Sequence, residues 1–353
     1  MSELLELRGV SKTFRLRGGR SLRAVKDVSL TVPAGSTLGL VGESGCGKST
    51  LARCIVGLHP VDSGSISFDG RDVTGLGRRA LRDVRRELVM VFQDPFASLN
   101  PRRRVGEIVA APLDIHDLCR GAERGRRVAA MLDRVGLSAE HARRYPHEFS
   151  GGQRQRIGLA RALITEPRLI VCDEPVSALD VSVQAQILNL LADLQSELDL
   201  TLVFIAHDLG VVRHIAQHVA VMYLGRIVEQ GPADELFAGP FHPYSAGLLA
   251  SVPVPDPAAR IDDDAVLAGD VPSTATALAG CDFHPRCPYA DERCRTDVPD
   301  LRELAAARRA ACHHPLAAPE PAGSTAPELA ASTPPELAGS AAPTRPGSGP
   351  PTP

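Results

Sequence analysis

The sequence predicts an α/β fold built on a parallel sheet that is buried on both faces. Three short apolar runs, residues 37–41, 169–172 and 202–206, each end at polar or glycine-rich residues. Continuous apolar runs of this length are typical of parallel strands covered by helices on both faces. The first run leads through a glycine-rich turn into a predicted helix over residues 48–58. Because ligands bind at the carboxyl ends of such strands, we expect the chemistry there.

Further elements are predicted around this core. Residues 29–32, 65–68 and 219–228 alternate in polarity or are broken by glycine, which favours antiparallel strands beside the core. An Arg-rich, mostly helical stretch between Gln93 and Arg161 is too long for one crossover and predicts an inserted helical subdomain. The Arg runs at residues 78–79, 85–86, 102–104 and 124–127 alternate with Asp and Glu, which is typical of solvated helix faces, although some of them could approach anionic lipid or a membrane partner.

The composition changes twice towards the end of the chain. Pro and Gly become frequent after about Pro232, and residues 316–353 contain ten Pro among 38 residues, with mostly Ala, Gly, Ser, Thr and Glu between them. Such a segment buries too little apolar surface to fold, so we predict a disordered tail.

Length and composition exclude several classes of protein. The chain has 353 residues, of which 44% are hydrophobic, which suffices for two domains or one large one. No apolar run approaches the roughly 18 residues of a membrane span, and no signal-peptide stretch opens the sequence, so we expect neither a spanning nor a secreted protein. A net charge of −3 argues against bulk electrostatic binding of nucleic acid. Without an export signal, clustered Cys would sooner hold a metal than form disulfides.

Residues 42–49, GESGCGKS, fit the phosphate-binding pattern G-x-x-x-x-G-K-[ST] and lie between a predicted strand and a predicted helix. The glycines let successive N–H groups turn toward phosphate oxygens, and the helix N-terminus adds partial positive charge. Lys48 then supplies a charge to the β and γ phosphates, and Ser49 ligates Mg²⁺. Cys46 fills an open position of the loop, and we assign it no redox role.

Two more segments carry chemistry. The apolar run at residues 169–172 continues into Asp173 and Glu174, the carboxylates that hold Mg²⁺ through water and polarise the attacking water in P-loop enzymes, although a simple strand cap would also place them there. Ser150, Gly151, Gly152 and Gln153 open a helical run that reaches Ile164, and a helix N-terminus of this kind receives an anion. An ordinary N-cap would account for the presence of Ser150 at the start of the helix, but not for that of the two glycines and Gln153.

Taken together, these residues resemble the signature motif of ATP-binding-cassette ATPases, with Phe149 where Leu is usual. The resemblance covers about residues 4–315. It implies a RecA-like core with an antiparallel β subdomain and the inserted helical subdomain. The expected boundaries are a cassette at residues 1–235 with its helical subdomain at about 94–165, a Cys-containing extension at 236–315 and the disordered tail at 316–353.

The resemblance also implies roles for single residues. Gln93 looks like the Q-loop glutamine, residues 177–180 like the D-loop and His207 like the switch histidine, while Phe14 sits where the family stacks an aromatic ring on adenine. By themselves, His207 would equally be a surface histidine and Phe14 a core residue. The residues implied to bind ATP are Phe14, Gly42, Glu43, Ser44, Gly45, Cys46, Gly47, Lys48, Ser49, Thr50 and Gln93; Mg²⁺ is implied at Ser49, Gln93 and Asp173, and catalysis by Glu174, His207 and Lys48.

In this family two cassettes pack head to tail, so the resemblance implies a second cassette subunit as partner. Each ATP would then lie between one phosphate loop and the other subunit's Ser150, Gly151, Gly152, Gln153 and Asp180. We therefore expect a lone monomer to hydrolyse ATP poorly.

Residues 93–101 (QDPFASLNP), residues 241–244 (FHPY) and residues 248–253 (LLASVP) resemble the ATPase subunits of oligopeptide and dipeptide importers. This implies a peripheral protein on the cytoplasmic face of the inner membrane that works with two integral membrane permeases and, indirectly, an extracytoplasmic substrate-binding protein. Nickel or another small solute stays open as cargo, and so does pairing with an identical or a homologous cassette. A soluble cassette ATPase acting on DNA or ribosomes is the alternative of another class, but one phosphate loop without coiled-coil heptads argues against it, and we expect no nucleic-acid partner.

Residues 280–288 (GCDFHPRCP) resemble the Cys-containing extension of the same importers. Cys281, Cys287, Cys294 and Cys312 are separated by five, six and seventeen residues, which matches neither a ferredoxin run nor a zinc ribbon. A [4Fe–4S] cluster, a Zn²⁺ site that includes His284, His313 or His314, and four buried thiols without metal all remain open on the residues alone, as does a metal sensor that retains a cassette. The resemblance favours an iron–sulfur cluster with a structural role.

Overall fold

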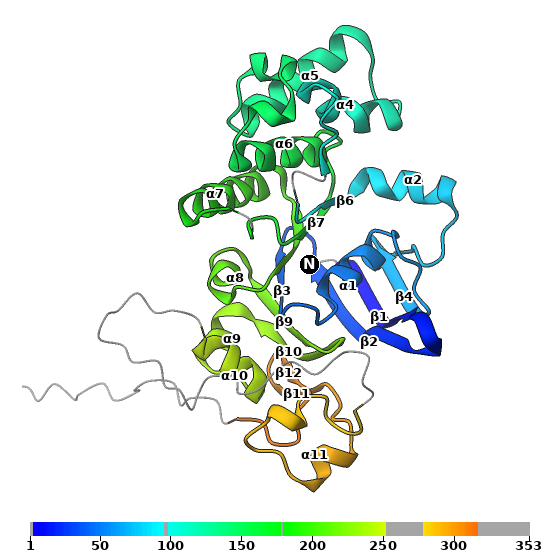
Figure 1. Ribbon diagram of the computed structural model, residues 1–353, viewed down its shortest axis with the longest axis vertical. Coiled ribbons are helices and arrows are strands. Elements are labelled where there is room, and N and C mark those ends of the chain that lie inside the picture. The colour runs from blue at the N-terminus through cyan, green and yellow to red at the C-terminus, as the bar shows by residue number, and fades with distance from the viewer. Residues whose placement is uncertain (1–2, 95–97, 178, 252–277, 317–353) are drawn as a thin grey trace, which may run out of the picture. The chain divides into compact units, whose positions relative to one another are not determined.

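Two sheets form the frame of the protein (Figure 1). The computed structural model describes residues 3–94, 98–177, 179–251 and 278–316. Within this part, the smaller sheet has the order β2-β1-β4-β5, and the main sheet has the order β11-β12-β10-β9-β3-β8-β7-β6. The strands are β1 (Glu3–Arg15), β2 (Ser21–Pro33), β3 (Thr37–Val41), β4 (Ser63–Phe68), β5 (Arg71–Asp72), β6 (Leu88–Val91), β7 (Leu169–Asp173), β8 (Thr201–Ala206), β9 (His218–Tyr223), β10 (Arg226–Pro232), β11 (Arg302–Ala305) and β12 (Arg308–Ala310).

The predicted α/β fold is confirmed by the parallel centre of the main sheet. β3 pairs in parallel with β8, β8 with β7, and β7 with β6. Alternation along β8 sends Leu202 and Phe204 into one apolar cluster and Val203 and Ile205 into another, so the sheet has a core on each face. This double burial explains why these strands appear in the sequence as continuous apolar runs.

The prediction of antiparallel strands beside the core was right for two segments and wrong for part of the third. β2 and β4, which contain residues 29–32 and 65–68, both pair antiparallel with β1 in the smaller sheet. Residues 219–228, however, form two strands. β9 pairs in parallel with β3 inside the main sheet. β10 pairs antiparallel with β9. Residues 219–228 look like one segment in the sequence because the turn between β9 and β10 is short. The sequence therefore does not show that the buried β9 and its neighbour β10 are separate strands.

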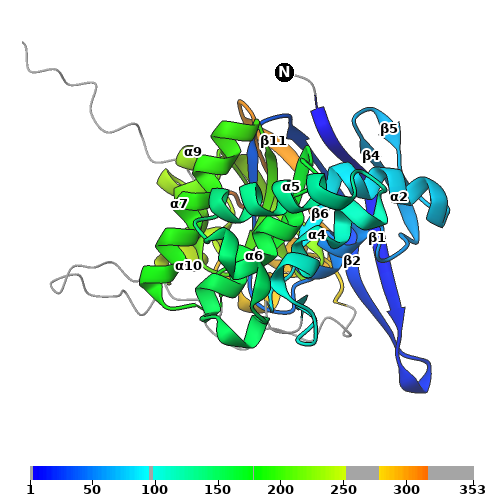
Figure 2. The same ribbon diagram turned by 90° about the horizontal axis from the view of Figure 1, so that it is seen from above.

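Helices cover the main sheet and build the inserted region. They are α1 (Lys48–Ile55), α2 (Arg78–Glu87), α4 (Val105–Ile115), α5 (Gly121–Arg134), α6 (Gly151–Leu163), α7 (Val181–Leu198), α8 (Leu209–Ile215), α9 (Ala233–Ala238), α10 (Pro243–Ala250) and α11 (Glu292–Thr296). Figure 2 looks onto α4, α5 and α6, which group together, with the β1–β2 hairpin projecting to one side. The predicted helix over residues 48–58 ends at Ile55, because the Leu58 N–H turns back to the Arg53 carbonyl at 2.7 Å.

The segment after α9 shares the main sheet with the cassette. β12 pairs antiparallel with β10, and Glu229 of β10 is 1% exposed. The Glu229 carboxylate accepts the N–H groups of Phe241 and His242 at 2.7 and 2.9 Å and lies 3.4 Å from the Arg308 guanidinium. A buried carboxylate needs such partners, so these contacts fix the start of α10 and the strand β12 to the sheet.

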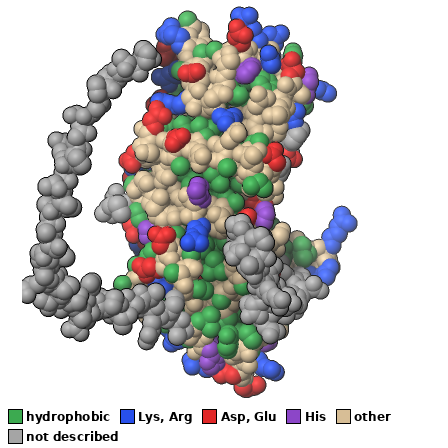
Figure 3. All heavy atoms as spheres, turned by 90° about the vertical axis from the view of Figure 1, so that its left-hand side faces the viewer, with side chains coloured by type: hydrophobic (Ala, Val, Ile, Leu, Met, Phe, Trp, Pro, Cys, Tyr) green, Lys and Arg blue, Asp and Glu red, His purple; other side chains and the backbone are tan. Residues whose placement is uncertain are grey.

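The helical region presents paired charges. Arg126 and Arg127 both form ion pairs with Glu123 on α5, and Arg124 pairs with Asp114 of α4. Figure 3 shows acidic and basic side chains next to one another at this end of the molecule. No helix among the described residues is long and apolar enough to cross a bilayer. The predicted disordered tail lies outside the described residues except for Leu316.

Replacing Phe204 tests the role of β8 in the core. Phe204 has no exposed surface and lies at the centre of the sheet. We expect Phe204→Ala to lower the free energy of unfolding by about 3–5 kcal/mol, because it leaves a cavity that the neighbouring strands cannot fill. Urea denaturation measures the change. Val181→Ala, at a side chain that is 81% exposed, is the matched control, and a similar small change for both variants would contradict this assignment.

Candidate nucleotide-binding site

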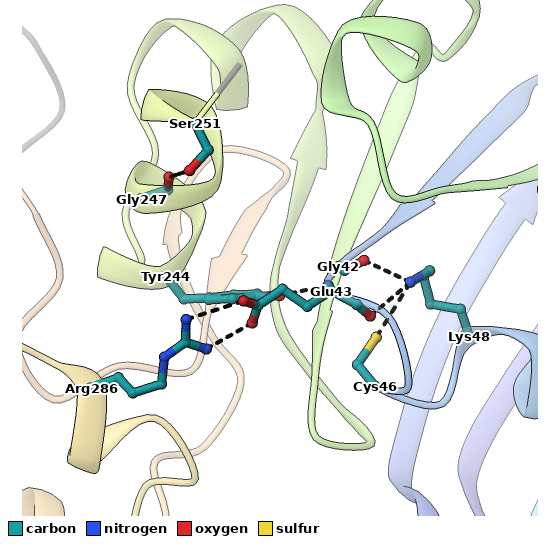
Figure 4. Close-up of polar contacts among 8 residues, drawn as sticks. All are labelled: Gly42, Glu43, Cys46, Lys48, Tyr244, Gly247, Ser251 and Arg286. Carbon is teal, nitrogen blue, oxygen red and sulfur yellow. Dashed lines mark hydrogen bonds and ion pairs between the residues drawn. The ribbon is translucent and has the colours of Figure 1, made fainter. Parts of the chain in front are cut away.

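The phosphate loop joins β3 to α1 and is closed by its own lysine (Figure 4). Lys48 is 4% exposed, and its Nζ donates to the carbonyls of Gly42 and Glu43 at 2.6 and 2.9 Å. Gly47 has φ +110°, and a Cβ there would lie 2.1 Å from the Ala24 carbonyl of β2, so only glycine fits. Burial raises the pKa of the Cys46 thiol. The loop therefore wraps around an ammonium group at the start of α1.

Ser49 and Asp173 meet beside this loop. The Ser49 hydroxyl, at the start of α1, donates to Asp173 Oδ1 at the end of β7 at 2.7 Å. Asp173 is 1% exposed, and burial raises its pKa, while the Ser49 hydrogen bond opposes that rise. A hydroxyl and a carboxylate are oxygen ligands of the kind that Mg²⁺ prefers, so these residues fit a Mg²⁺ site.

Glu174 stands next to this pair and contacts two other predicted site residues. Gln93 Nε2 donates to Glu174 Oε2 at 2.9 Å, and His207 Nδ1 lies 3.4 Å from the same oxygen. Glu174 has φ 45°, a left-handed conformation that is costly for a residue with a side chain. Its N–H donates to the Ile205 carbonyl of β8 at 3.0 Å, which holds this conformation. Gln93, Glu174 and His207 follow three adjacent parallel strands and therefore meet at one edge of the sheet.

A cavity of about 500 Å³ opens beside Asp173 and Gln93. Phe92, Arg53 and Arg161 also line it, and Arg161 donates to the Ser98 carbonyl at 2.6 Å. No role was predicted for these two arginines from the sequence. The cavity is lined by two carboxylates (Asp94 and Asp173), one amide and two guanidinium groups, which provide ligands for a metal ion and for an anion.

The predicted signature residues lie at the N-terminus of α6, which is separate from α1 in Figure 1. The Ser150 hydroxyl accepts the Gln153 N–H at 3.4 Å, and Gln153 Oε1 accepts the Ser150 N–H at 3.1 Å, so the pair forms a capping box. A Cβ at Gly152 would lie 2.4 Å from Val183 Cγ1, so close packing on α7 also requires this glycine. The cap accounts for both Ser150 and Gln153 without a ligand, which the sequence had not suggested for Gln153.

The remaining predicted residues occupy separate places. Asp180 caps α7 by accepting the Val183 N–H at 2.9 Å, and its neighbour Ala178 lies outside the described residues. Phe14 of β1 packs edge-on against His59, with ring centroids 5.3 Å apart, and Lys12 Nζ lies 5.5 Å from its ring centre. Stacking of Phe14 on adenine stays a prediction.

The four cysteines of the C-terminal segment interact electrostatically, but among the described residues the group of three ligand atoms within 4.8 Å of one another contains only Cys294 of the four. The Cys281 N–H donates to the Cys294 carbonyl at 2.8 Å, and Cys312 lies near the thiols of Cys281, Cys287 and Cys294. Burial raises the pKa of both Cys281 and Cys312 to about 11. Ligand atoms of Asp291, Cys294 and His314 also lie within 4.8 Å of one another. His284 and His313 instead contact the carbonyls of Cys281 and Asp297.

Two residues that were not predicted from the sequence contact the phosphate loop. The Glu43 N–H donates to the Tyr244 hydroxyl at 2.9 Å, and the Glu43 carboxylate accepts two hydrogen bonds from Arg286 at 2.8 and 3.1 Å. Tyr244 and Arg286 belong to the segments FHPY and GCDFHPRCP, which had been read only as marks of a subfamily. The signal was present, but contact across more than 200 residues cannot be read from a single sequence.

Removing the buried charge at Asp173 tests the electrostatics of the site. We expect Asp173→Asn to raise the free energy of unfolding at pH 7. Burial raises the folded pKa above the unfolded value of 3.8, so the wild-type chain loses stability as the pH rises from 3.8 through the folded pKa. The gain in the free energy of unfolding is therefore largest above the folded pKa of Asp173 and vanishes below pH 3.8. Urea denaturation across pH measures it, with the exposed Asp193→Asn as control, and a gain independent of pH would refute the assignment.

Comparison with known proteins adds to this geometry. The profile of the ABC transporter family matches residues 25–177, and that of the oligopeptide/dipeptide transporter C-terminal region matches residues 228–294. Among solved structures, a dimeric ATP-binding cassette in a post-hydrolysis state bound to ADP and phosphate matches with a TM-score of 0.59 and 31% identity, covering 65% of this chain and 98% of that one. A subunit of an ABC transporter complex from Clostridium perfringens matches with a TM-score of 0.60 and 28% identity, covering 67% and 92%.

Curated relatives match over nearly the whole chain. A probable peptide ABC transporter ATP-binding protein of Sinorhizobium fredii is 52% identical over 88% of this chain and 89% of its own length. An oligopeptide transport ATP-binding protein of Bacillus subtilis is 49% identical over 88% and 97%, and a di/tripeptide transport ATP-binding protein of Pseudomonas aeruginosa is 48% identical over 89% and 98%. At this identity and coverage, the chain belongs to the ABC transporter family, as one of its ATP-binding, ATP-hydrolysing subunits.

Proposed function

We propose that this chain powers the uptake of di- and oligopeptides by binding and hydrolysing ATP with Mg²⁺. The observation that carries the proposal is the meeting of Lys48, the Ser49–Asp173 pair and the Gln93–Glu174–His207 group at one edge of the parallel sheet. The peptide specificity rests on the curated relatives and on the C-terminal profile match. Nickel or another small solute is the alternative cargo of the same machine.

In the proposed reaction, each polar group acts on a defined part of the substrate. The N–H groups of residues 42–50 and the Lys48 ammonium bind the β and γ phosphates, and Phe14 stacks on adenine. Ser49, Asp173 and Gln93 would hold Mg²⁺, which neutralises phosphate charge. Glu174 accepts a proton from the attacking water, whose oxygen bonds to the γ phosphorus as the bond to the ADP oxygen breaks. His207, beside the Glu174 carboxylate, contacts the γ phosphate.

A second cassette completes the proposed site. Ser150, Gly151, Gly152 and Gln153, together with Asp180, would act on ATP bound by the partner subunit. The separation of α6 from α1 within one chain supports this arrangement, and so does the dimeric state of a solved relative. The open N–H groups at the α6 N-terminus would donate to the γ phosphate from the opposite side.

The remaining partners follow from the same proposal. The chain would dock on two integral membrane permeases at the cytoplasmic face of the inner membrane, would meet an extracytoplasmic substrate-binding protein only through them, and would bind no nucleic acid. Residues 1–235 would form the cassette, with a helical subdomain at about 94–165, and residues 236–315 its extension, followed by a tail at 316–353.

We further propose that Cys281, Cys287, Cys294 and Cys312 hold a [4Fe–4S] cluster, with Zn²⁺ as the alternative. Two of these cysteines are buried and two are half-buried, and Cys312 interacts electrostatically with the other three; this supports a metal centre, because cysteine thiolates are the ligands that both metals use. The position of His314 beside Cys294 and Asp291 keeps a zinc site open. In either case the metal centre would stabilise a segment that has little regular secondary structure.

Glu174→Gln tests the proposed hydrolysis site. The amide keeps the size and the contact region of the side chain but cannot accept a proton. We expect ATP binding to persist while kcat falls by about 10²-fold or more, and we expect an ATP-bound dimer to accumulate. Single-turnover kinetics and gel filtration with ATP measure both effects. Turnover close to wild type would remove Glu174 as the base.

Purification from the native membrane under anaerobic conditions tests the importer proposal and the metal centre together. We expect two permeases and a second cassette subunit to copurify, with iron and sulfide in equal amounts. Cys287→Ser should lose the metal, while Cys119→Ser, at a cysteine of the helical region, should retain it. Zinc in place of iron would support the alternative centre, and absence of membrane partners would contradict the importer proposal.

A further inference from the structure

We propose that Arg286 and Tyr244 are positioning residues of the nucleotide site, which hold the phosphate loop in its binding shape through Glu43. This inference rests on the proposed ATP-binding role of that loop. It assigns a function to the C-terminal extension within the ATP site itself, in addition to any metal that the extension carries.

The contacts of Glu43 carry the argument (Figure 4). Its N–H donates to the Tyr244 hydroxyl at 2.9 Å, and its carbonyl accepts from Lys48 Nζ at 2.9 Å. Its carboxylate accepts hydrogen bonds from both terminal nitrogens of the Arg286 guanidinium at 2.8 and 3.1 Å. The backbone and the side chain of one loop residue are thus held from three directions. Two of the three holding groups come from residues that lie about 200 positions further along the chain.

Burial makes these contacts strong and rigid. The Arg286 side chain is 5% exposed and the Glu43 side chain 23% exposed, so water screens the bidentate pair only weakly. The ring of Tyr244 packs against those of Tyr223 and Phe283, with centroids 4.6 and 5.5 Å away. An aromatic cluster of this kind fixes the position of the Tyr244 hydroxyl. The Tyr244 hydroxyl is therefore held in place by its ring contacts, and the Arg286–Glu43 pair is only weakly screened by water.

A second buried ion pair anchors the same segment to β2. Lys26 of β2 donates to the Asp282 carboxylate at 3.0 and 3.1 Å, and both side chains are 9% exposed. β2 also supplies the Ala24 carbonyl against which Gly47 packs. Residues 282–286 thus bridge β2 and the phosphate loop. The segment therefore joins the phosphate loop to β2.

A phosphate loop binds nucleotide well when its N–H groups are oriented for the phosphates before the nucleotide arrives. Any freedom that the loop gains in the absence of nucleotide must be lost again on binding, which weakens affinity. Arg286 contacts the Glu43 carboxylate, and Tyr244 contacts the Glu43 N–H. Neither contact involves a group that reacts. Loss of either contact should therefore raise the Kd for nucleotide more than it lowers kcat at saturating ATP.

The test uses the full-length chain and a fluorescent ATP analogue with Mg²⁺ as the probe. We expect Arg286→Met and Tyr244→Phe each to raise the Kd by about fivefold or more, since each leaves a polar group of Glu43 without its partner. Arg286→Lys should fall between Arg286→Met and wild type, because it keeps the charge but loses the bidentate geometry. Arg309→Met is the matched control: Arg309 lies on β12 of the same extension and donates to the Leu301 carbonyl at 3.0 Å, away from the phosphate loop and Asp282, and the Kd of this variant should stay close to wild type.

A double-mutant cycle separates positioning from a general loss of structure. If Arg286 acts through Glu43, Glu43→Gln combined with Arg286→Met should raise the Kd no more than the larger single effect. Additive effects, an unchanged Kd in Arg286→Met, or equal losses in the Arg309→Met control would each overturn the inference. If the wild-type chain itself fails to bind the probe, the proposed function fails instead, so the two outcomes are distinguishable. Thermal unfolding of each variant shows whether its fold is intact.

Discussion

Parallel pairing of β3, β8, β7 and β6 is the constraint on which the rest of the structure depends. Parallel strands end at the same edge of a sheet, so residues that follow different strands meet there without any loop having to reach across the molecule. This is how Ser49 comes within hydrogen-bonding distance of Asp173, and Gln93 and His207 come close to Glu174, although these residues span much of the sequence. The apolar faces of the same strands bury both cores, so the site and the fold share one origin.

The site holds groups that a structure selected for stability alone would avoid. Asp173 is a carboxylate at the end of an otherwise apolar strand, and burial disfavours its charge. Glu174 takes a left-handed backbone conformation that the neighbouring strand holds through the Ile205 carbonyl. Unfavourable charge and unfavourable backbone conformation at adjacent residues are typical of functional sites, where the surrounding structure supplies the energy that holds them.

The C-terminal extension is joined to the cassette by buried polar contacts rather than by a linker. Glu229 links β10 to the start of α10 and to Arg308, and Arg286 and Asp282 link the Cys-containing segment to the phosphate loop and β2. A boundary at residue 235 follows the change in composition, yet these contacts cross it. Because the crossing pairs are buried, separating the two parts would expose charges and orphan their partners, so we regard the extension as part of the ATP-binding unit.

The sequence by itself determined the fold class and the chemistry of the loop. Continuous apolar runs predicted β3, β7 and β8, and the spacing of Gly47, Lys48 and Ser49 predicted a phosphate site between a strand and a helix, because these signals are local. The tertiary structure alone decided the parallel pairing of β9 with β3, the contact of Gly152 with α7 and the contact of Arg286 and Tyr244 with Glu43. These depend on which surfaces meet after the chain has folded. Residues far apart in a sequence carry no mark of their partners, whereas periodicity and turn chemistry are written in neighbouring residues.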